Sequence, residues 1–334
     1  MRRTSITSAV LLLLLTAACA RDVAGPRSTD GQFTEVAVLR AAADVTTQST
    51  PAADPAIAYG SQSGKPNHVV YGLYVMNSDG SNQTALLTTA SSTPHPSWSP
   101  DGHSIAYHAA TYDITRADVS VVNGVPRAGT PVALPITHTA FDIAWSPDPT
   151  NPQIAYTESQ GNIGAPAGIY VISTTPSGFS ERLAYLGPQG NRMIWVTWNP
   201  QATKLAFVQR SIDVAVDSVF VLDVATSTTT FVRSFVRGVL GLSWSRTPPD
   251  RLALAIPQPN NASGYDPSIL DLSTNTITHV ASGPSAKWSP DDSYLVYLAP
   301  QRNASSPVYK VNLSTGVQTL LAAQGTEPEW RRNP

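Results

Sequence analysis

The chain has 334 residues, with 21 Lys and Arg against 23 Asp and Glu, and its formal net charge is −2. Charged residues make up 13% of the chain, well below the roughly 25% that is usual in soluble domains. This composition argues against nucleic-acid binding, because such proteins carry a basic patch or stripe. Amphipathic helical periodicity is nearly absent, which favours an all-β fold.

The first residues are typical of an export signal. Arg2 and Arg3 precede an apolar run, 9–15, that is too short to span a bilayer. The only cysteine, Cys19, comes next, directly after small residues. This arrangement resembles a bacterial lipobox, which implies a signal peptide of residues 1–18, cleavage before Cys19, and lipid on its thiol and amine. Ordinary cleavage after Ala20 is the alternative, since Ala18 and Ala20 also fit the rule for small residues.

Residues 19–56 are rich in Ala, Thr, Asp and Pro, which indicates a flexible tether. A multiply acylated Cys19 would hold the chain firmly on a membrane. Residue 20 is Ala and not Asp, which resembles an outer-membrane lipoprotein under the usual bacterial sorting rule. We therefore expect a lipid-anchored protein of the bacterial cell envelope, on the periplasmic face of the outer membrane.

A tryptophan-centred motif then recurs along the rest of the chain. Its clearest copy is Trp98-Ser99-Pro100-Asp101-Gly102, followed by the apolar triplet 105–107. The differences between successive tryptophan numbers run from 42 to 53, and a fixed period of this size is the signature of a repeat protein. The tryptophans that open the copies are Trp98, Trp145, Trp198, Trp244, Trp288 and Trp330.

Each copy has the chemistry of two strands joined by a tight turn. Pro presets φ for the first central turn position, and Asp-Gly suits the positions that follow. A third strand, such as 73–76, and a fourth, such as 84–87, complete the unit. Four short strands per period of about 40 to 45 residues predict one antiparallel blade of a β-propeller.

The motif at 98–107, together with the strand and turn at 73–81, resembles the TolB-type (WD-like) propeller repeat. The resemblance covers roughly residues 57–334 and implies a β-propeller with a partner-binding role at the cell envelope. Proteins of the TolB type carry an additional α/β domain before the propeller. We expect this chain to lack that domain, so the partners of TolB are not carried over to it.

The ends of the repeat region predict how the ring closes. Trp330 has no returning strands after it, whereas Ile57-Ala58-Tyr59 matches the triplet 105–107 and has no tryptophan before it. We therefore expect Trp330 to lie on the inner strand of the closing blade and residues 57–87 to supply its other three strands. The prediction is a six-bladed propeller of four-stranded antiparallel blades over residues 57–334.

No catalytic motif stands out in the sequence. Gly-x-Ser-x-Gly, a phosphate loop and His-Glu-x-x-His are all missing, so we expect no cofactor, no metal and no enzyme. His95, His103 and His108 are expected on an inner strand, a turn and a returning strand, where they need not converge. The repeated tryptophans are interpreted as packing between blades, and Asp101, Asp148 and Asp291 as turn-capping residues.

A binding site, if present, is predicted at the mouth of the pore, where the segments that lead into the inner strands converge. Trp195, which lies outside the repeat position, is either a ligand-stacking aromatic there or, preferably, a core residue. Mixed charges at the mouth suit a peptide or protein partner better than a polyanion. The candidate residues are His95, His138, Asp142, Arg192, Trp195, Arg237, Lys287 and Glu329.

Three functions remain open from the sequence. The preferred hypothesis is a monomeric, membrane-anchored scaffold that binds an unidentified envelope protein or peptide and has no catalytic role. The first alternative is a pore-site lyase or hydrolase acting on a sugar polymer, with His95, His138 and Arg192 as catalytic candidates and Asp142 as their acidic partner. The second alternative is a small-ligand sensor, which would need a deep apolar pore with few polar groups.

Overall fold

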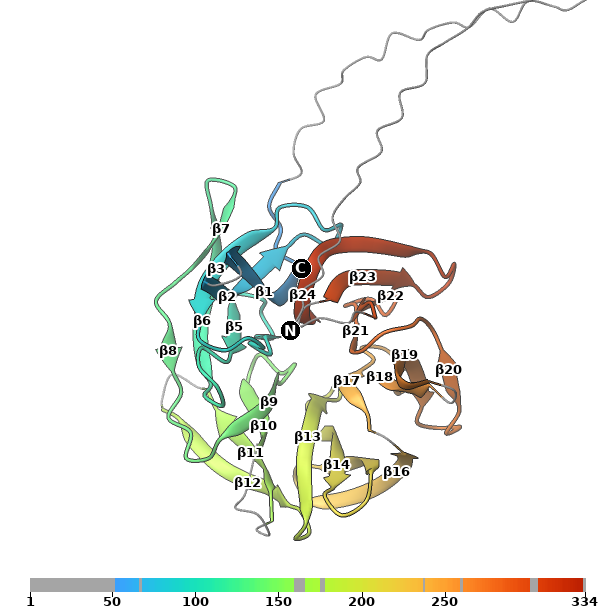
Figure 1. Ribbon diagram of the computed structural model, residues 1–334. Helices are drawn as coiled ribbons and strands as arrows, with labels where there is room; N and C mark the ends of the chain where they lie inside the picture. The colour runs from blue at the N-terminus through green and yellow to red at the C-terminus, as the bar shows by residue number, and fades with distance from the viewer. Residues whose placement is uncertain are drawn as a thin grey trace, which may run out of the picture. The chain divides into compact units, whose positions relative to one another are not determined.

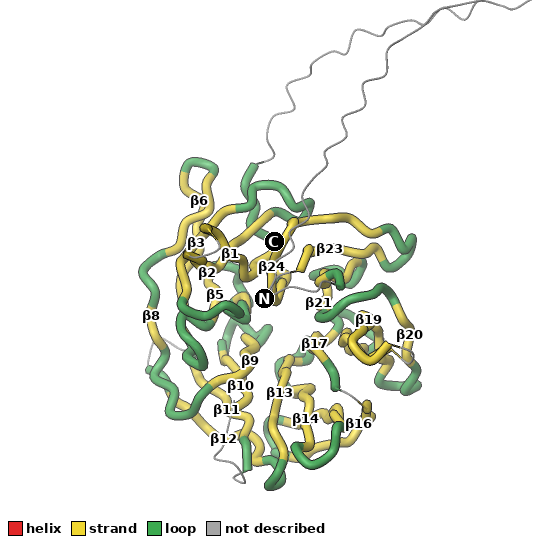
Figure 2. Tube along the Cα trace, in the orientation of Figure 1, coloured by secondary structure: helices red, strands yellow, loops and turns green. Residues whose placement is uncertain are grey.

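Strands are the only regular elements in the seven segments of the chain that the computed structural model describes (Figure 2). These segments accordingly contain no helix with the length and hydrophobicity that a membrane span requires. The predicted signal peptide 1–18, Cys19 and the tether up to residue 51 lie outside them. The described residues are 52–65, 68–158, 166–174, 178–236, 238–258, 261–300 and 306–332.

The described strands form five hydrogen-bonded sheets, which lie around one central axis like the blades of a propeller (Figure 1). Three of these sheets have four antiparallel strands each, and their strand order follows the chain. The first strand of each lies nearest the axis (Figure 1). The strands are β9 (Ala140–Trp145), β10 (Gln153–Glu158), β11 (Gly168–Ser173), β12 (Ser180–Leu186), β13 (Asn191–Trp198), β14 (Lys204–Ser211), β15 (Val216–Asp223), β16 (Thr228–Val236), β17 (Leu240–Trp244), β18 (Arg251–Gln258), β19 (Asn261–Asp271) and β20 (Ile277–His279).

The other two sheets are larger. One has five strands in the order β4-β5-β6-β7, with β8 also paired to β6, and the other has seven strands in the order β21-β22-β23-β24-β1-β2-β3. Their bounds are β4 (Ser97–Trp98), β5 (Ser104–Tyr107), β6 (Thr115–Val122), β7 (Val125–Ala128), β8 (Val132–Ala133), β21 (Ala286–Trp288), β22 (Tyr294–Leu298), β23 (Ser306–Asn312), β24 (Gln318–Trp330), β1 (Ile57–Lys65), β2 (His68–Met76) and β3 (Thr84–Thr89).

The seven-stranded sheet joins the two ends of the described chain. The first part of β24 pairs with β23, and its last part pairs with β1, where Ile57 faces Trp330 and Ala58 faces Glu329. Figure 1 shows this as blue strands lying beside red ones. The predicted ring closure, with residues 57–59 beside 327–331, is therefore confirmed.

Residues 52–56, which the sequence assigned to the tether, are already attached to the ring. The amide of Ala56 donates to Met76 O at 2.9 Å, and Arg331 N donates to Ala56 O at 2.7 Å. The carboxylate of Asp54 pairs with Arg331 Nη2 at 2.5 Å. The ordered unit thus begins before the predicted boundary at Ile57, because this segment can satisfy its backbone groups against β2 and the end of β24.

The innermost strands contact one another in a closed cycle. β4 contacts β9, and the contacts continue through β13, β17, β21 and β24 back to β4. All of these strands run in the same sense along the axis, because each leads to its tryptophan. The channel therefore has two ends: the start face, where the innermost strands begin, and the turn face, where they end after each tryptophan.

The tryptophans fill the seams between neighbouring sheets. Their exposed fractions lie between 0% and 4%. Trp198 packs with Ile169 and Val171 of the preceding sheet, and Trp330 packs with Val296 and Val308 of β22 and β23 within the seven-stranded sheet. Full burial of a large aromatic side chain stabilises the fold by about 2–3 kcal/mol. The interpretation of these residues as packing between blades is confirmed.

The turns after the tryptophans repeat one set of hydrogen bonds. Ser99 Oγ accepts from Ser104 N at 2.9 Å, and Asp101 accepts from the amide of His103 at 3.0 Å. Ser289 and Asp291 make the same bonds in a later copy, and Asp148 accepts from the amide of Thr150. These carboxylates satisfy turn amides, as an Asx turn does, so their predicted role as turn-capping residues is confirmed.

Candidate functional site

The residues that line the channel are defined by their distance from the repeat tryptophan. Register shifts in β13 and β17 interrupt the alternation of side chains before the tryptophan, so the residues one and three places before each tryptophan form two separate sets. We name these the −1 and −3 levels, and the residue two places after the tryptophan the +2 level. The −3 level is His95, Asp142, Trp195, Gly241, Ser285 and Glu327.

The backbone is strained at the −3 level, on the side of the start face. His95, Trp195, Ser285 and Glu327 all have positive φ, between 42° and 64°. Left-handed backbone costs a residue with a side chain about 1–2 kcal/mol. The strand register shifts at Trp195, and again between Ala58 and Gly60, which face the end of β24. These are bulges that re-aim a side chain, and here they set the −3 level.

His95 and Asp142 form a buried ion pair at this level. His95 Nδ1 lies 3.3 Å from Asp142 Oδ1, and the two side chains are 11% and 5% exposed. Asp142 Oδ2 also accepts from Val196 N at 2.8 Å. Burial opposes both charges, but the hydrogen bond between the pair and the surrounding charges outweigh it, so the pKa of His95 is raised and that of Asp142 is lowered.

Aromatic side chains surround the pair. The ring of Trp195 lies 5.9 Å from that of His95 and 5.6 Å from that of Phe141, between centroids. Trp195 is 8% exposed, and its Nε1 donates to Val239 O at 2.8 Å. Its packing and its satisfied nitrogen support the preferred interpretation as a core residue. His108 lies 5.4 Å from His95, and burial, followed by the nearby His95, lowers the pKa of His108 to about 4.

Lys287 and Glu329 form an ion pair between the −3 level and the arginine at the +2 level. Lys287 Nζ lies 3.5 Å from Glu329 Oε2 and donates to Leu242 O at 3.1 Å. Burial alone would lower the pKa of Lys287, but the carboxylates of Glu329 and Asp142 outweigh it, so this pKa is raised. Glu329 Oε1 also lies 3.9 Å from Arg246 Nη2. Both residues belong to the −1 level, whose other members are Ser97, Ala144, Thr197 and Ser243.

The −1 hydroxyl groups connect neighbouring sheets. Ser97 Oγ accepts from the backbone amide of Trp145 at 2.9 Å, and Ser243 Oγ accepts from that of Trp288 at 3.2 Å. Each bond satisfies the amide of a buried tryptophan on the next innermost strand. The −1 level is therefore structural in these copies, and only the last two copies place charged groups there.

The structure brings five of the eight predicted candidates together on the axis: His95, Asp142, Trp195, Lys287 and Glu329. The remaining three are elsewhere or outside the description. Arg192 is exposed at the start of β13, opposite Arg210 of β14. Arg237 lies outside the described residues.

The prediction that places His138 at the pore mouth is wrong. Its ring stacks on Tyr170 of β11 with 4.0 Å between centroids, and its Nδ1 lies 3.9 Å from Glu181 of β12. β11 and β12 are the third and fourth strands from the axis. The chain crosses over these outer strands before it reaches β9, and His138 stands seven residues before Trp145, too early to reach the channel.

Sequence reasoning missed several residues of the channel. His108 and Phe141 pack against His95, so the expectation that His95 and His108 need not converge is wrong for this pair. Arg246 and Arg332, at the +2 level, are not among the candidate residues predicted from the sequence. Counting a fixed offset from each tryptophan would have found both arginines, because their copies have Arg where the others have Pro.

Comparison with solved structures places the fold in a known group. No protein-family model and no curated protein matches the sequence. TolB from Acinetobacter baumannii is 19% identical with a TM-score of 0.60, over 83% of this chain and 66% of that one. A putative TolB from Agrobacterium tumefaciens is 15% identical with a TM-score of 0.56, over 73% and 86% of the two chains.

A chain from a nidogen/laminin complex is 12% identical with a TM-score of 0.56, over 82% of this chain and 98% of that one. At these identities the likeness concerns the fold, and this chain spans just under two thirds of the Acinetobacter TolB. The protein thus has the fold of TolB and related β-propeller proteins.

Proposed function

We propose that the chain forms a six-bladed propeller in which the seven-stranded sheet counts as two blades. β24 has 13 residues, and its two halves pair with different strands, β23 and β1. It therefore acts as the fourth strand of one blade and the first strand of the next. The closed cycle of contacts between the innermost strands supports the same count.

The function that the geometry supports best is protein or peptide binding on the start face. The observation that carries this proposal is a set of exposed apolar side chains at the start face, beyond the buried charges of the −3 level. The strand registers place these side chains on start-face loops and strand ends. They are Val69, Tyr112, Leu186, Ile212, Val214 and Val236, with exposed fractions from 41% to 68%.

Such a surface fits a macromolecular partner. Exposed apolar side chains supply contact area for a partner and mark interaction sites where they lie close together. The charged groups beneath are of both signs, which suits a peptide or protein segment better than a polyanion. We expect the propeller to act as a non-catalytic scaffold.

The proposal places this scaffold at the bacterial envelope. Its support is the lipobox-like sequence at Cys19, with Ala20 after it, and the resemblance to TolB-type proteins, which implies a partner-binding role there. Lipid on Cys19 would hold the propeller on the periplasmic face of the outer membrane. Globomycin treatment tests this part, because continued processing to the mature size would argue against lipid attachment at Cys19.

The alternative of a pore-site lyase or hydrolase has narrower support. It required His95, His138 and Arg192 in one place, but His138 lies against Tyr170 and Arg192 lies at the start of β13. Only His95 and Asp142 of that set are together, and each already binds the other. A binding role does not require His138 or Arg192 to move toward the axis.

A matched pair of surface variants tests partner binding. Val214 is 58% exposed on the start face, and Val317 is 60% exposed in the turn between β23 and β24 on the turn face. We expect Val214→Glu to lose partners recovered from the envelope with the intact lipoprotein, and Val317→Glu to retain them. Equal recovery by both variants would remove the start face from the proposal.

A further inference from the structure

The +2 level forms a small cavity on the axis at the turn face. Its volume is about 150 Å³. The +2 residues of every copy line it, although they come from positions more than 230 residues apart. These residues are Pro100, Pro147, Pro200, Arg246, Pro290 and Arg332.

The two arginines are buried in this cavity without full hydrogen bonding. Arg332 is 9% exposed, and the side chain of Arg246 is 13% exposed. Neither Arg332 Nη1 nor Arg246 Nε has a hydrogen-bond partner among the described residues. Buried polar groups normally have partners, and an unpaired buried charge costs several kcal/mol. A missing partner is therefore expected at this place.

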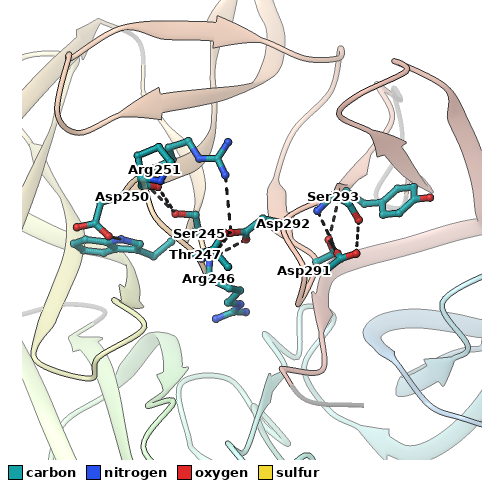
Figure 3. Close-up of polar contacts among 12 residues, drawn as sticks. Ser245, Arg246, Thr247, Asp250, Arg251, Asp291, Asp292 and Ser293 are labelled. Atoms are coloured by element: carbon teal, nitrogen blue, oxygen red, sulfur yellow. Dashed lines mark hydrogen bonds and ion pairs between the residues drawn. The ribbon is translucent and has the colours of Figure 1, made fainter.

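The neighbouring acids are already engaged. Glu329 is shared between Lys287, at 3.5 Å, and Arg246 Nη2, at 3.9 Å. The carboxylate of Asp292 accepts from the backbone amides of Arg246 and Thr247 at 2.8–3.0 Å. Figure 3 shows the guanidinium of Arg246 extending away from this carboxylate, while Arg251 points toward it. In the described part of the chain, no carboxylate forms an ion pair with Arg332.

The electrostatics agree with this geometry. Burial, and next the positive charge of Arg246, hold the pKa of Arg332 well below its usual range, and Glu329 offsets only part of this. Burial also lowers the pKa of Arg246 against the pull of Glu329 and Asp292. Two cations that repel each other in a shared cavity would both be stabilised by an anion between them.

We propose that Arg246 and Arg332 bind a small tetrahedral oxyanion of the phosphate class on the axis of the channel. The planar guanidinium presents paired N–H groups that match phosphate oxygens. The proline side of the cavity is rigid and has no amide hydrogen to offer, so recognition rests on the two arginines. The site lies at the opposite end of the channel from the start face and does not depend on partner binding there.

Thermal unfolding and calorimetry with inorganic phosphate test this site, with sodium chloride at equal ionic strength as the reference. A ligand that binds only the folded state raises Tm in a saturable way. We expect that rise for the wild-type chain, and affinity at least tenfold weaker for Arg332→Gln. In chloride alone, Arg332→Gln should unfold at a higher temperature than wild type, because an unpaired buried charge has been removed.

Two further variants control this test. Arg182→Gln removes an exposed arginine of β12 and should bind phosphate like wild type. Arg332→Lys keeps the positive charge without the paired N–H groups, and we expect intermediate affinity. If Arg332→Gln does not fold, the affinity of Arg332→Lys for phosphate still tests the site. An equal rise in Tm for wild type and both Arg332 variants, or no saturable binding by wild type, would overturn the proposal.

Glycerol 1-phosphate distinguishes a free ion from a phosphate group on a larger molecule. Binding of inorganic phosphate alone would assign the cavity to the free ion. Binding of both, each lost in Arg332→Gln, would assign it to a phosphate group carried into the channel. Either result supports the oxyanion site, whereas binding of either compound that is unchanged in Arg332→Gln contradicts it.

Discussion

The two ends of the channel handle buried charge in opposite ways. Toward the start face, His95 is paired with Asp142, and below them Lys287 is paired with Glu329. At the turn face, Nη1 of Arg332 has no hydrogen-bond partner among residues 52–332 as described, and a second arginine is its neighbour. The charges near the start face are neutralised by each other, whereas Arg246 shares Glu329 with Lys287 and Arg332 forms no ion pair with a described carboxylate. Polar residues near a pore mouth are therefore not all binding residues.

The contrast between the two ends indicates which residues a protein partner would contact. The pairing of His95 with Asp142 and the hydrogen bond of Trp195 to Val239 make these residues part of the structure beneath the start face. A protein partner would meet the exposed apolar side chains of the start face first, at positions such as Val214 and Val236. We therefore expect substitutions of these side chains to affect binding, and substitutions of the paired charges to affect stability.

Asp142→Ala should give the largest change in stability. It leaves His95 without its partner and removes the acceptor of Val196 N. Removing one member of a buried pair costs about 3–5 kcal/mol, which urea unfolding would measure. Asp142→Asn is the control, since its amide oxygen still accepts from Val196 N but carries no charge, and its cost should be smaller. A loss below about 1 kcal/mol for Asp142→Ala would contradict the pairing.

Asp292→Gly should give the next largest effect. Asp292 has φ of 58° where the clearest copy of the repeat has Gly102, with φ of 72°. Glycine would relieve this strain but would remove the carboxylate that bonds Arg246 N, Thr247 N and Thr247 Oγ1 across two sheets. Hydrogen bonds to charged groups contribute about 1.5–3 kcal/mol each.

We expect the lost bonds to prevail, with a fall of about 2 kcal/mol or more in the free energy of unfolding. Asp292→Asn keeps one side-chain oxygen as an acceptor without the negative charge, and should lose less stability. Higher stability of Asp292→Gly would show that backbone strain outweighs this contact between neighbouring sheets.

The pH dependence of stability should change least. Burial lowers the pKa of His95, but its bond to Asp142 and the nearby carboxylates raise it above the usual value. The stability from His95 is then fully present below about pH 6.5 and is lost as pH rises through the folded pKa. Asp142 acts in the opposite sense, because its lowered pKa gives stability above about pH 4 that is lost in acid.

Unfolding of wild type and His95→Gln at several pH values checks this expectation. The wild-type advantage should be greatest between about pH 4 and 6.5 and should shrink above that range. The lowered pKa of His108, about 4 in the folded chain, costs stability as pH falls below about 6.5. Because His95 contributes to that lowering, the variant His95→Gln,His108→Gln is compared with His108→Gln alone to isolate His95. A difference that grows with rising pH would contradict a raised pKa.

The sequence predicted the fold well because the repeat carries its own register. The spacing of the tryptophans, the turn chemistry at Asp101 and the unmatched triplet at Ile57 were enough to predict an all-β propeller and the pairing of β1 with Trp330. Four strands per sheet holds for three of the five described sheets. These features depend on local rules and on a period, both of which can be read from one chain.

The site was predicted less well, because residues at the same distance from each tryptophan meet on the axis although they are far apart in the sequence. Lys287 and Glu329 were named, but their contact depends on adjacent blades meeting at the closing seam. The prediction misplaces His138 because the loop that leads to β9 first crosses β11 and β12. Seven residues before Trp145, the chain has not yet reached the axis. Counting residues from each tryptophan predicts that Arg246 and Arg332 occupy equivalent positions. Only the structure shows that they share a cavity and that Arg332 Nη1 has no partner among the described residues.

A crystal structure of the chain grown with selenate, a tetrahedral anion with an anomalous signal, tests the contrast between the two ends most directly. We predict an anomalous peak within hydrogen-bonding distance of Arg246 and Arg332, and none between His95 and Asp142. A cavity without selenate at the turn face, or a peak beside the His95 and Asp142 pair, would contradict the account.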